Sequence, residues 1–465
     1  MSHHFDPTIL RAYDIRGQVG STLHPEDAFA IGRSFGAHIH CQKERPRIAV
    51  GRDGRLTSPL LSQHLIDGLV ASGCHVIDIG TGPTPMLYFA DRILECDGAI
   101  QVTGSHNPKD FNGFKIVRNH QSFFGDDIQM LGDIASKELP AASAAGISEV
   151  QDILPEYVSV LRKEACFQGL TLVWDCGNGA CGPALNALLE GAEGHHTALY
   201  TEVDGNFPNH HPNPVDPETL ESLRQHVFEA DADCGIGFDG DGDRIGVIDA
   251  KGRQVAGDIL TAYLADDILS RKPASEILFD VKSSAAAMDI VRMSGGNPSL
   301  WKTGHSHMKK RLKDVGAPLA GEMSGHIFIS DGYYGFDDAL FVAARLSGLL
   351  SRAKDKRDLS LTEFVDQLPP SFATPECRIA CDDNVKFSVM DTLSQQMSAT
   401  FRSDQLNLLD GVRLTTEQGW CLIRPSNTEG ALIARAEGRS EDALDDMVTL
   451  LSDQLASVGI IWDGR

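Results

Sequence analysis

Short apolar segments alternate with stretches of helical periodicity through most of the chain. The first series of apolar segments covers residues 48–50, 75–80 and 99–102. The second covers 172–174, 196–200 and 234–238. The third covers 277–282 and 299–301 and leads to the polar segment 321–326. This alternation is typical of βαβ units, so each series predicts one α/β domain.

Each series ends in a polar, glycine-rich loop that follows its third predicted strand. The three loops are residues 103–108, 239–244 and 321–326. Open α/β sheets bind ligands at the ends of their strands. We therefore expect the three loops to converge on one site.

A smaller section follows Pro369 and Pro370, which stop helix and strand alike. It holds predicted strands at 419–423 and 431–436, joined by a loop at 424–430, and then a helix capped by Ser440. The apolar face of that helix comprises Leu444, Met447, Val448, Leu451 and Leu455. The predicted fold class is α/β, with three similar mixed α/β-sheet domains and a smaller α+β C-terminal domain. We place their boundaries at 1–150, 151–254, 255–368 and 369–465.

Composition narrows the range of partners. The 465 residues carry a formal net charge of −24, which repels nucleic acids and anionic membranes, so neither is an expected partner. We see no signal peptide and no apolar stretch long enough to cross a bilayer. The ten cysteines form no C-x-x-C pair, so we interpret them as thiols of a reducing, cytoplasmic protein. In so acidic a chain, a phosphate ester substrate requires a local cluster of cations.

The loop at 239–244 carries the most specific chemistry. Asp239, Asp241 and Asp243 alternate with glycines, and three carboxylates directed at one point suit Mg²⁺ or Ca²⁺. An EF-hand is excluded, because its sixth and twelfth positions are Arg244 and Ala250. Residues 235–240 also match the dinucleotide pattern G-x-G-x-x-G. However, the segment that follows is typical of a strand, not of the required helix, so we disfavour that interpretation.

Two other loops suit a sugar phosphate less specifically. Ser105 follows a predicted strand, and taken alone it is most simply a turn residue; Lys115 lies a few residues further on. Glu322, Ser324 and His326 can bind sugar hydroxyls and move protons near neutral pH, although a polar loop with a structural histidine is an equal alternative.

Further candidates for anion binding lie elsewhere in the chain. The loop at 424–430 offers the planar donors of Arg424, with more donors on Ser426, Asn427 and Thr428. Its simpler interpretation is an ordinary turn between strands. His305 is a candidate phosphate or sugar contact.

Together these motifs resemble the α-D-phosphohexomutase superfamily, and within it the bacterial phosphomannomutase/phosphoglucomutase group. The matching segments are 12–17, 103–108, 239–244, 321–326 and 424–430, in this order along the chain. The resemblance implies a heart-shaped enzyme of four domains around a central cleft. It also implies phosphoserine at Ser105, with Mg²⁺ held by Asp239, Asp241, Asp243 and the phosphorylated Ser105.

The resemblance implies an intramolecular phosphotransferase that interconverts hexose 1-phosphate and hexose 6-phosphate, with mannose and glucose as the sugars. We expect the reaction to pass through a 1,6-bisphosphate, with glucose 1,6-bisphosphate or mannose 1,6-bisphosphate as activator and intermediate. The candidate catalytic residues are Ser105, which the resemblance implies, and Lys115, Arg244 and His326. Of these, Lys115 and His326 are our candidates for proton transfer. The implied substrate-binding residues are Tyr13, Arg16, Lys282, His305, Glu322, Ser324, His326, Arg424, Ser426, Asn427 and Thr428.

Alternatives remain within and outside this class. In the family, the positions of Glu322 and Ser324 contact O3 and O4, whereas glucose, mannose and glucosamine differ only at C2. A phosphoglucosamine mutase is therefore the alternative of the same class, although Met323 favours mannose and glucose by resemblance. A phosphatase, in which water takes the phosphoryl group from Ser105, is the alternative of a different class. We expect small hexose phosphates as the only partners, and we favour a monomer.

Overall fold

The computed structural model describes residues 2–40, 43–140, 142, 144–355, 358–382, 385–426, 430–462 and 464. The chain packs into two compact units, one formed by Met1–Leu260 with Ser324–Phe364 and the other by Thr261–Met323 with Val365–Arg465. Helices α8 (Gly257–Arg271) and α12 (Leu361–Asp366) each carry the chain from one unit into the other. Among the described residues, none of the helices combines the length and the apolar character needed to cross a bilayer.

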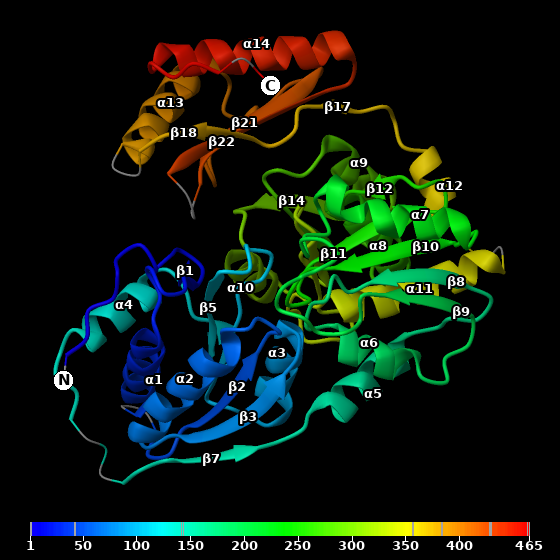
Figure 1. Ribbon diagram of the computed structural model, residues 1–465. Helices are drawn as coiled ribbons and strands as arrows, with labels where there is room; N and C mark the ends of the chain where they lie inside the picture. The colour runs from blue at the N-terminus through cyan, green and yellow to red at the C-terminus, as the bar shows by residue number, and fades with distance from the viewer. Residues whose placement is uncertain are drawn as a thin grey trace. The chain divides into compact units, whose positions relative to one another are not determined.

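The first sheet belongs to the first unit and has parallel strands at its centre (Figure 1). Strand β2 (Arg47–Arg52) lies between β3 (His75–Thr81) and β4 (Gly98–Val102), and helices α2 (Ser58–Ala71) and α3 (Thr84–Ile93) connect the three strands. Strand β5 (Phe111–Arg118) runs antiparallel beside β4, and β1 (Ile15–Gln18) runs antiparallel beside β5. The remaining elements are α1 (Pro25–His40), β6 (Gln121–Ser122), α4 (Asp126–Ala135) and β7 (Ile147–Val150).

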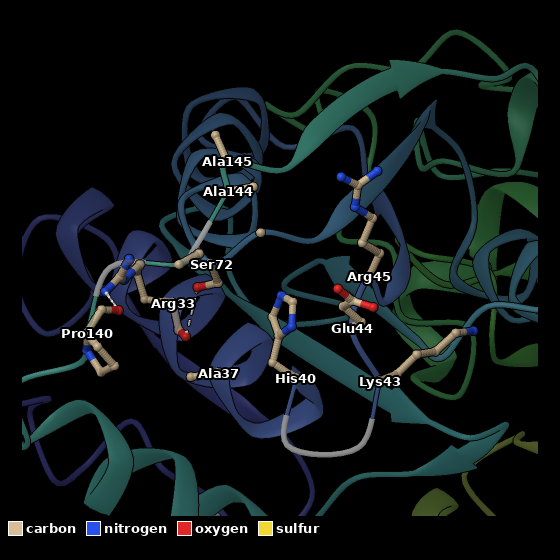
Figure 2. A pocket seen from close by; sticks show the side chains of 12 residues that line it. Arg33, Ala37, His40, Lys43, Glu44, Arg45, Ser72, Pro140, Ala144 and Ala145 are labelled. Atoms are coloured by element: carbon tan, nitrogen blue, oxygen red, sulfur yellow. Dashed lines mark hydrogen bonds between the residues drawn. The ribbon is translucent and has the colours of Figure 1, made fainter.

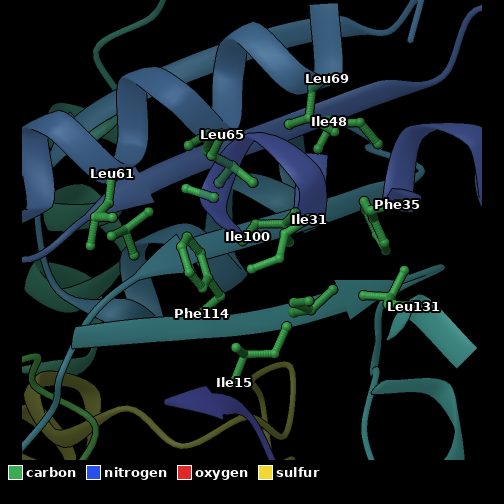
Figure 3. Close-up of a cluster of buried hydrophobic side chains, with 14 of the residues drawn as sticks. Ile15, Ile31, Phe35, Ile48, Leu61, Leu65, Leu69, Ile100, Phe114 and Leu131 are labelled. Carbon is green, nitrogen blue, oxygen red and sulfur yellow. The ribbon is translucent and has the colours of Figure 1, made fainter. Parts of the chain in front are cut away.

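The apolar segments that predict this sheet are the ones that it buries. Ile48 of β2 and Ile100 of β4 pack with Leu65 of α2, Phe35 of α1 and Phe114 of β5 in one fully buried cluster (Figure 3). Full burial of such a side chain contributes about 1.5–3 kcal/mol. The cluster therefore holds α1, α2 and α4 against the sheet whose strand ends carry the loop 103–108.

The second sheet repeats the arrangement in the same unit. Strand β8 (Thr171–Asp175) lies between parallel strands β9 (His195–Leu199) and β10 (Cys234–Phe238). Strand β11 (Ile245–Asp249) runs antiparallel beside β10, and β12 (Gln254–Val255) pairs with β11. The helices are α5 (Leu154–Glu164), α6 (Gly182–Leu189), the short 3₁₀ helix η1 (Pro217–Leu220) and α7 (Glu221–Glu229). Strand β16 (Ile327–Ile329) and helix α11 (Ala339–Lys354) also belong to this unit.

The second unit contains the third series of parallel strands. Strand β13 (Glu276–Asp280) lies between β14 (Asn297–Trp301) and β15 (Leu319–Gly321), with helices α9 (Ala285–Met293) and α10 (His305–Val315). The parallel strands of the three βαβ series thus lie in the orders β4-β2-β3, β10-β8-β9 and β15-β13-β14, and in the first sheet β7 adds a further parallel strand beside β3. The repeated βαβ order predicted from the hydrophobic pattern is confirmed.

The C-terminal section forms a mostly antiparallel sheet with two helices. Its elements are β17 (Phe372–Ala373), β18 (Cys377–Ala380), α13 (Lys386–Thr400), β19 (Leu406–Asn407), β20 (Val412–Thr415), β21 (Gly419–Pro425), β22 (Ala431–Gly438) and α14 (Glu441–Ser457). Ser440 caps α14 as predicted, because its Oγ accepts a hydrogen bond from the Ala443 amide at 3.1 Å. One prediction was wrong: Arg424 lies in strand β21 and not in the following loop. The antiparallel register with β22 pairs Arg424 with Ile433 and extends the strand to Pro425.

Candidate active site

The aspartate loop joins β10 to β11 and buries all three carboxylates. Asp239, Asp241 and Asp243 are each fully buried, and one oxygen from each lies within 4.8 Å of the others. Asp239 Oδ1 accepts hydrogen bonds from the amides of Asp243 (3.1 Å) and Arg244 (3.2 Å), which close the loop on itself. The three side chains therefore form one compact acidic cluster, as the sequence pattern predicts.

At two positions of this loop, 240 and 242, the structure requires glycine. A Cβ on Gly240 would lie 2.6 Å from the Ser105 carbonyl oxygen, so only glycine permits this approach of the two loops. Gly242 has φ = +74°, a left-handed conformation that side chains rarely adopt. The alternation of aspartate and glycine thus reflects both the clustering of carboxylates and the contact with the serine loop.

The electrostatics of the cluster favour a bound cation. Burial, together with repulsion from Asp241 and Asp243, raises the pKa of Asp239 well above its ordinary value. Burial acts in the same direction on Asp243, but the charge of Lys115 and the contact with His326 outweigh it and lower the pKa of Asp243. Asp241 Oδ1 is buried and has no hydrogen-bond partner among the residues that the structure describes. Hard, buried carboxylate oxygens of this kind fit Mg²⁺ or Ca²⁺.

Ser105 reaches the aspartate cluster from the first sheet. Its side chain is almost completely buried, and its Oγ donates a hydrogen bond to Asp239 Oδ2 at 2.9 Å. The His106 ring nitrogen Nδ1 lies 3.1 Å from the same Oγ. The serine loop and the aspartate loop, which are 134 residues apart, therefore meet as expected.

Lys115, Arg244 and His326 surround the aspartate cluster. Lys115 Nζ donates to Asp241 Oδ2 at 2.7 Å and also to Asp243 Oδ2. His326 Nε2 lies 3.4 Å from Asp243 Oδ1, and Arg244 Nε lies 3.3 Å from the same ring nitrogen. All three residues predicted to be catalytic together with Ser105 thus lie at one place.

Two further predicted contacts lie at the edge of this cluster. Arg16 Nη1 donates to Asn107 Oδ1 of the serine loop at 3.3 Å, and Arg16 also pairs with Asp14. Ser324 Oγ lies 3.3 Å from His326 Nδ1. Tyr13, in the same segment as Arg16, is half-buried.

The second unit holds its own group of predicted substrate contacts. Glu322 is buried and accepts a hydrogen bond from the Gly304 amide at 2.6 Å, at the N-terminus of α10, where a negative charge is stabilised. His305, the first residue of that helix, is also buried. Lys282 Nζ donates to Glu376 Oε2 at 2.9 Å.

Arg424 is buried at the end of β21 and is held by a carboxylate. Its Nε donates to Asp410 Oδ2 at 2.9 Å and its Nη2 to Asp410 Oδ1 at 3.3 Å. Ser426 is buried beyond it, and its carbonyl accepts a hydrogen bond from Lys386 Nζ at 2.7 Å. Asn427 and Thr428, predicted to bind the same phosphate, lie outside the described residues.

Sequence reasoning missed the groups that hold the predicted site residues in place. The Thr84 amide donates a hydrogen bond to the Asp241 carbonyl oxygen at 2.7 Å, and the Thr84 hydroxyl donates one to Asp241 Oδ2. In the second unit, Glu376 and Asp410 pair with Lys282 and Arg424. Each lies in its own part of the sequence, outside the glycine-rich loops, so no motif signalled it.

A separate cavity of about 580 Å³ lies in the first unit beside the C-terminal end of α1 (Figure 2). Its described lining includes Arg33, Lys43 and Arg45 but none of the predicted site residues. Arg33 donates to the Ala71 carbonyl at 2.9 Å, and Lys43 pairs with Asp97 at 2.8 Å, so two of its cations already have partners. Because no predicted site residue lines this cavity, the aspartate cluster remains the candidate active site.

The fold is α/β, and it places a buried acidic cluster beside a serine hydroxyl. The chain belongs to the phosphoglucomutase/phosphomannomutase family, because four consecutive parts of it match that family. Residues 7–139, 151–252 and 256–372 match its alpha/beta/alpha domains I, II and III, and residues 378–454 match its C-terminal domain.

Several named proteins are similar over nearly their whole length. The chain is 44% identical to a phosphomannomutase/phosphoglucomutase of Pseudomonas aeruginosa, covering 97% of this chain and 96% of that one. It is 39% identical to a phosphoglucomutase of Neisseria gonorrhoeae, covering 94% of each chain. The crystal structure of a family protein from Burkholderia thailandensis superposes with a TM-score of 0.89 at 39% identity, covering 98% of each chain. Three α/β domains and a C-terminal domain, as predicted from the sequence, are thereby confirmed.

Proposed function

We propose that this protein is a phosphohexomutase that interconverts the 1-phosphates and 6-phosphates of mannose and glucose. The observation that carries the proposal is the buried contact of Ser105 Oγ with Asp239, 2.9 Å apart, inside a cluster of three carboxylates. A hydroxyl in that place can carry a phosphoryl group where a metal offsets its charge. Membership of the family and the named relatives support the same activity.

Asp239, Asp241 and Asp243 are the proposed ligands of Mg²⁺, together with an oxygen of phosphorylated Ser105. When bound, the metal supplies positive charge that stabilises a transferring phosphoryl group. Arg244 and Lys115 add positive charge from the protein at the same place. Phosphoryl transfer needs mainly positioning and such charge neutralisation, which these residues provide.

The proposed reaction consists of two transfers. In the first, the bond between phosphorus and Ser105 Oγ breaks and a bond forms to the free hydroxyl of the sugar phosphate, whose proton leaves to a base. In the second, the other phosphate of the resulting 1,6-bisphosphate returns to Ser105. Lys115 and His326, both in contact with the carboxylates, are our candidates for accepting and returning the proton. Glucose 1,6-bisphosphate or mannose 1,6-bisphosphate would load Ser105 as activator.

The remaining residues are proposed to hold the rest of the substrate. Glu322 and Ser324 accept and donate hydrogen bonds to sugar hydroxyls. The phosphate that does not react is held by cations and donors, namely Lys282, His305, Arg424, Ser426, Asn427 and Thr428, and Tyr13 and Arg16 contact the substrate beside Ser105. Contacts at O3 and O4 accept both mannose and glucose. We further propose a cytoplasmic monomer, in keeping with the nine described cysteines, all free thiols.

Mass spectrometry and coupled assays test this function. The intact mass of the purified protein, with and without glucose 1,6-bisphosphate, is expected to reveal one added phosphate that maps to Ser105. Activity on mannose 1-phosphate and glucose 1-phosphate is expected to exceed that on glucosamine 1-phosphate. No phosphate at Ser105 in either state would contradict the mechanism. Release of inorganic phosphate at the rate of turnover would identify a phosphatase instead.

A further inference from the structure

Arg55 is buried against the serine loop and donates four hydrogen bonds to backbone carbonyls. Its Nη2 donates to the carbonyls of Ser105 (2.7 Å) and Asn107 (2.6 Å), and its Nη1 donates to those of Pro108 (2.5 Å) and Phe111 (2.9 Å). The side chain is fully buried. A planar guanidinium has fixed donor directions, so one side chain can hold four acceptors in one arrangement.

Asp53 joins this arginine to the other side of the same loop. Its Oδ2 lies 3.2 Å from Arg55 Nε and accepts hydrogen bonds from Thr103 Oγ1 (2.8 Å) and the Gly104 amide (3.0 Å). The Ser105 amide in turn donates to Thr103 Oγ1 at 2.9 Å. The backbone around Ser105 is thus held on its amide side by Asp53 and on its carbonyl side by Arg55.

These contacts hold Ser105 in an uncommon conformation. Its φ is +49°, in the left-handed region, which costs a residue other than glycine about 1–3 kcal/mol and persists only where the surroundings enforce it. A Cβ on Gly104 would come within 2.4 Å of Arg55 Cζ, so the guanidinium lies directly against the loop backbone. The guanidinium also lies over the Phe207 ring, with Cζ 5.4 Å from the ring centroid.

We propose that Arg55, oriented by Asp53, is a positioning residue for phosphoryl transfer. It holds the Ser105 carbonyl and the following turn so that Oγ faces Asp239, and it acts only through the backbone. This inference rests on the proposed role of Ser105 as phosphoryl carrier. Misplacement of a reacting group by 1 Å lowers a rate by about 100-fold. Substitution of Arg55 should therefore lower kcat and leave KM nearly unchanged, because other residues hold the sugar and its phosphate.

The test compares Arg55→Lys with a matched control, Arg33→Lys. Lysine keeps the charge but replaces the fixed fork with a single ammonium group. Arg33 belongs to the same unit and also donates to backbone carbonyls, those of Ala71, Leu139 and Pro140, away from Ser105. We expect kcat to fall by about 100-fold in Arg55→Lys. We expect the rate at which glucose 1,6-bisphosphate phosphorylates Ser105, followed by intact mass, to fall equally. In Arg33→Lys both rates should stay close to wild type.

The outcomes separate this inference from the proposed function. Wild-type protein that takes no phosphate at Ser105 would overturn the role of Ser105. A second outcome would overturn the positioning role alone. In that outcome the wild type is phosphorylated at Ser105, and Arg55→Lys has the kcat of the wild type per folded molecule. The same conclusion would follow if the loss of activity only matched the loss of folded protein, measured by circular dichroism, or if KM rose while kcat did not change.

Discussion

Ser105 combines a buried hydroxyl, a left-handed backbone and a carboxylate neighbour, a combination suited to one reactive group. Ser105→Ala removes only the Oγ atom, so we expect it to abolish mutase activity while sugar phosphates still bind. Equilibrium binding measured by calorimetry, together with the coupled assay, checks both expectations. The control is Ser34→Ala, a buried serine of the same unit, which should keep wild-type turnover. Measurable turnover in Ser105→Ala would remove Ser105 from the mechanism.

Arg424 places one buried guanidinium at the end of β21, where we propose that the non-reacting phosphate binds. It is held by two hydrogen bonds to Asp410, and a charged hydrogen bond to a phosphate contributes about 1.5–3 kcal/mol. Arg424→Ala should therefore raise KM by about 10-fold to 100-fold with a smaller effect on kcat. Arg439→Ala, at an exposed arginine directly after β22, is the matched control. Steady-state kinetics of both variants test this prediction. An unchanged KM in Arg424→Ala would contradict the proposed contact between Arg424 and the phosphate.

At the scale of elements, helix α11 begins at a buried capping carboxylate. Asp338 accepts hydrogen bonds from the Phe341 amide (2.9 Å) and from the hydroxyls of Tyr157 and Tyr333 (2.8 Å each). Burial outweighs these bonds and raises the pKa of Asp338 to about 6. Its folded state therefore binds a proton more tightly than the unfolded state does, and this contribution to stability is lost as the pH rises through 6.

Asp338→Asn should remove that pH dependence and keep the cap, since asparagine caps helices well. Between pH 5.5 and 7.5 the wild type should lose about 1 kcal/mol relative to the variant. That difference corresponds to about 1–2 °C in the melting temperature of a chain of this size. Thermal melts of both proteins at the two pH values test the prediction. A constant difference in melting temperature would contradict the buried, protonated carboxyl group.

The aspartate loop is expected to make the stability of the protein depend on Mg²⁺. Mg²⁺ that binds the folded protein stabilises it by about 2.7 kcal/mol at a concentration of 100 Kd. We expect Mg²⁺ to raise the melting temperature of the wild type and EDTA to reverse the increase. Asp241→Asn should abolish the increase, because it removes the charge of a carboxylate that has a buried oxygen without a protein partner among the described residues. An equal increase in the variant would place the metal elsewhere.

At the scale of the whole molecule, the chain forms two compact units, and each contains a cluster of buried apolar side chains. We expect scanning calorimetry to yield a calorimetric enthalpy larger than the van't Hoff enthalpy, because the units need not unfold together. Leu455→Ala in the C-terminal core and Leu65→Ala in the first core each create a cavity that costs about 2–5 kcal/mol. Each should shift a different transition. A single transition that both variants shift equally would contradict independent unfolding.

Much of this architecture follows from local patterns. The spacing of apolar residues predicts the parallel strands, because a buried strand must be apolar along its length. The cap at Ser440 and the buried positions Met447, Leu451 and Leu455 of α14 also follow from local rules. The antiparallel strands β5 and β1 beside the first sheet, and the extension of β21 through Arg424, did not follow, since strand partners depend on register with distant segments.

The same division applies to the active site. The sequence alone predicted the candidate residues. The carboxylates that alternate with glycines are a local feature, whereas Ser105 became a candidate only through the set of motifs as a whole. Only the tertiary structure decided which groups meet: Asp239 with Ser105, Asp410 with Arg424 and the Arg55 guanidinium with the serine loop. The physical reason is that periodicity records burial within one element, whereas a buried charge or hydroxyl finds its partner through the packing of elements that are far apart in the chain.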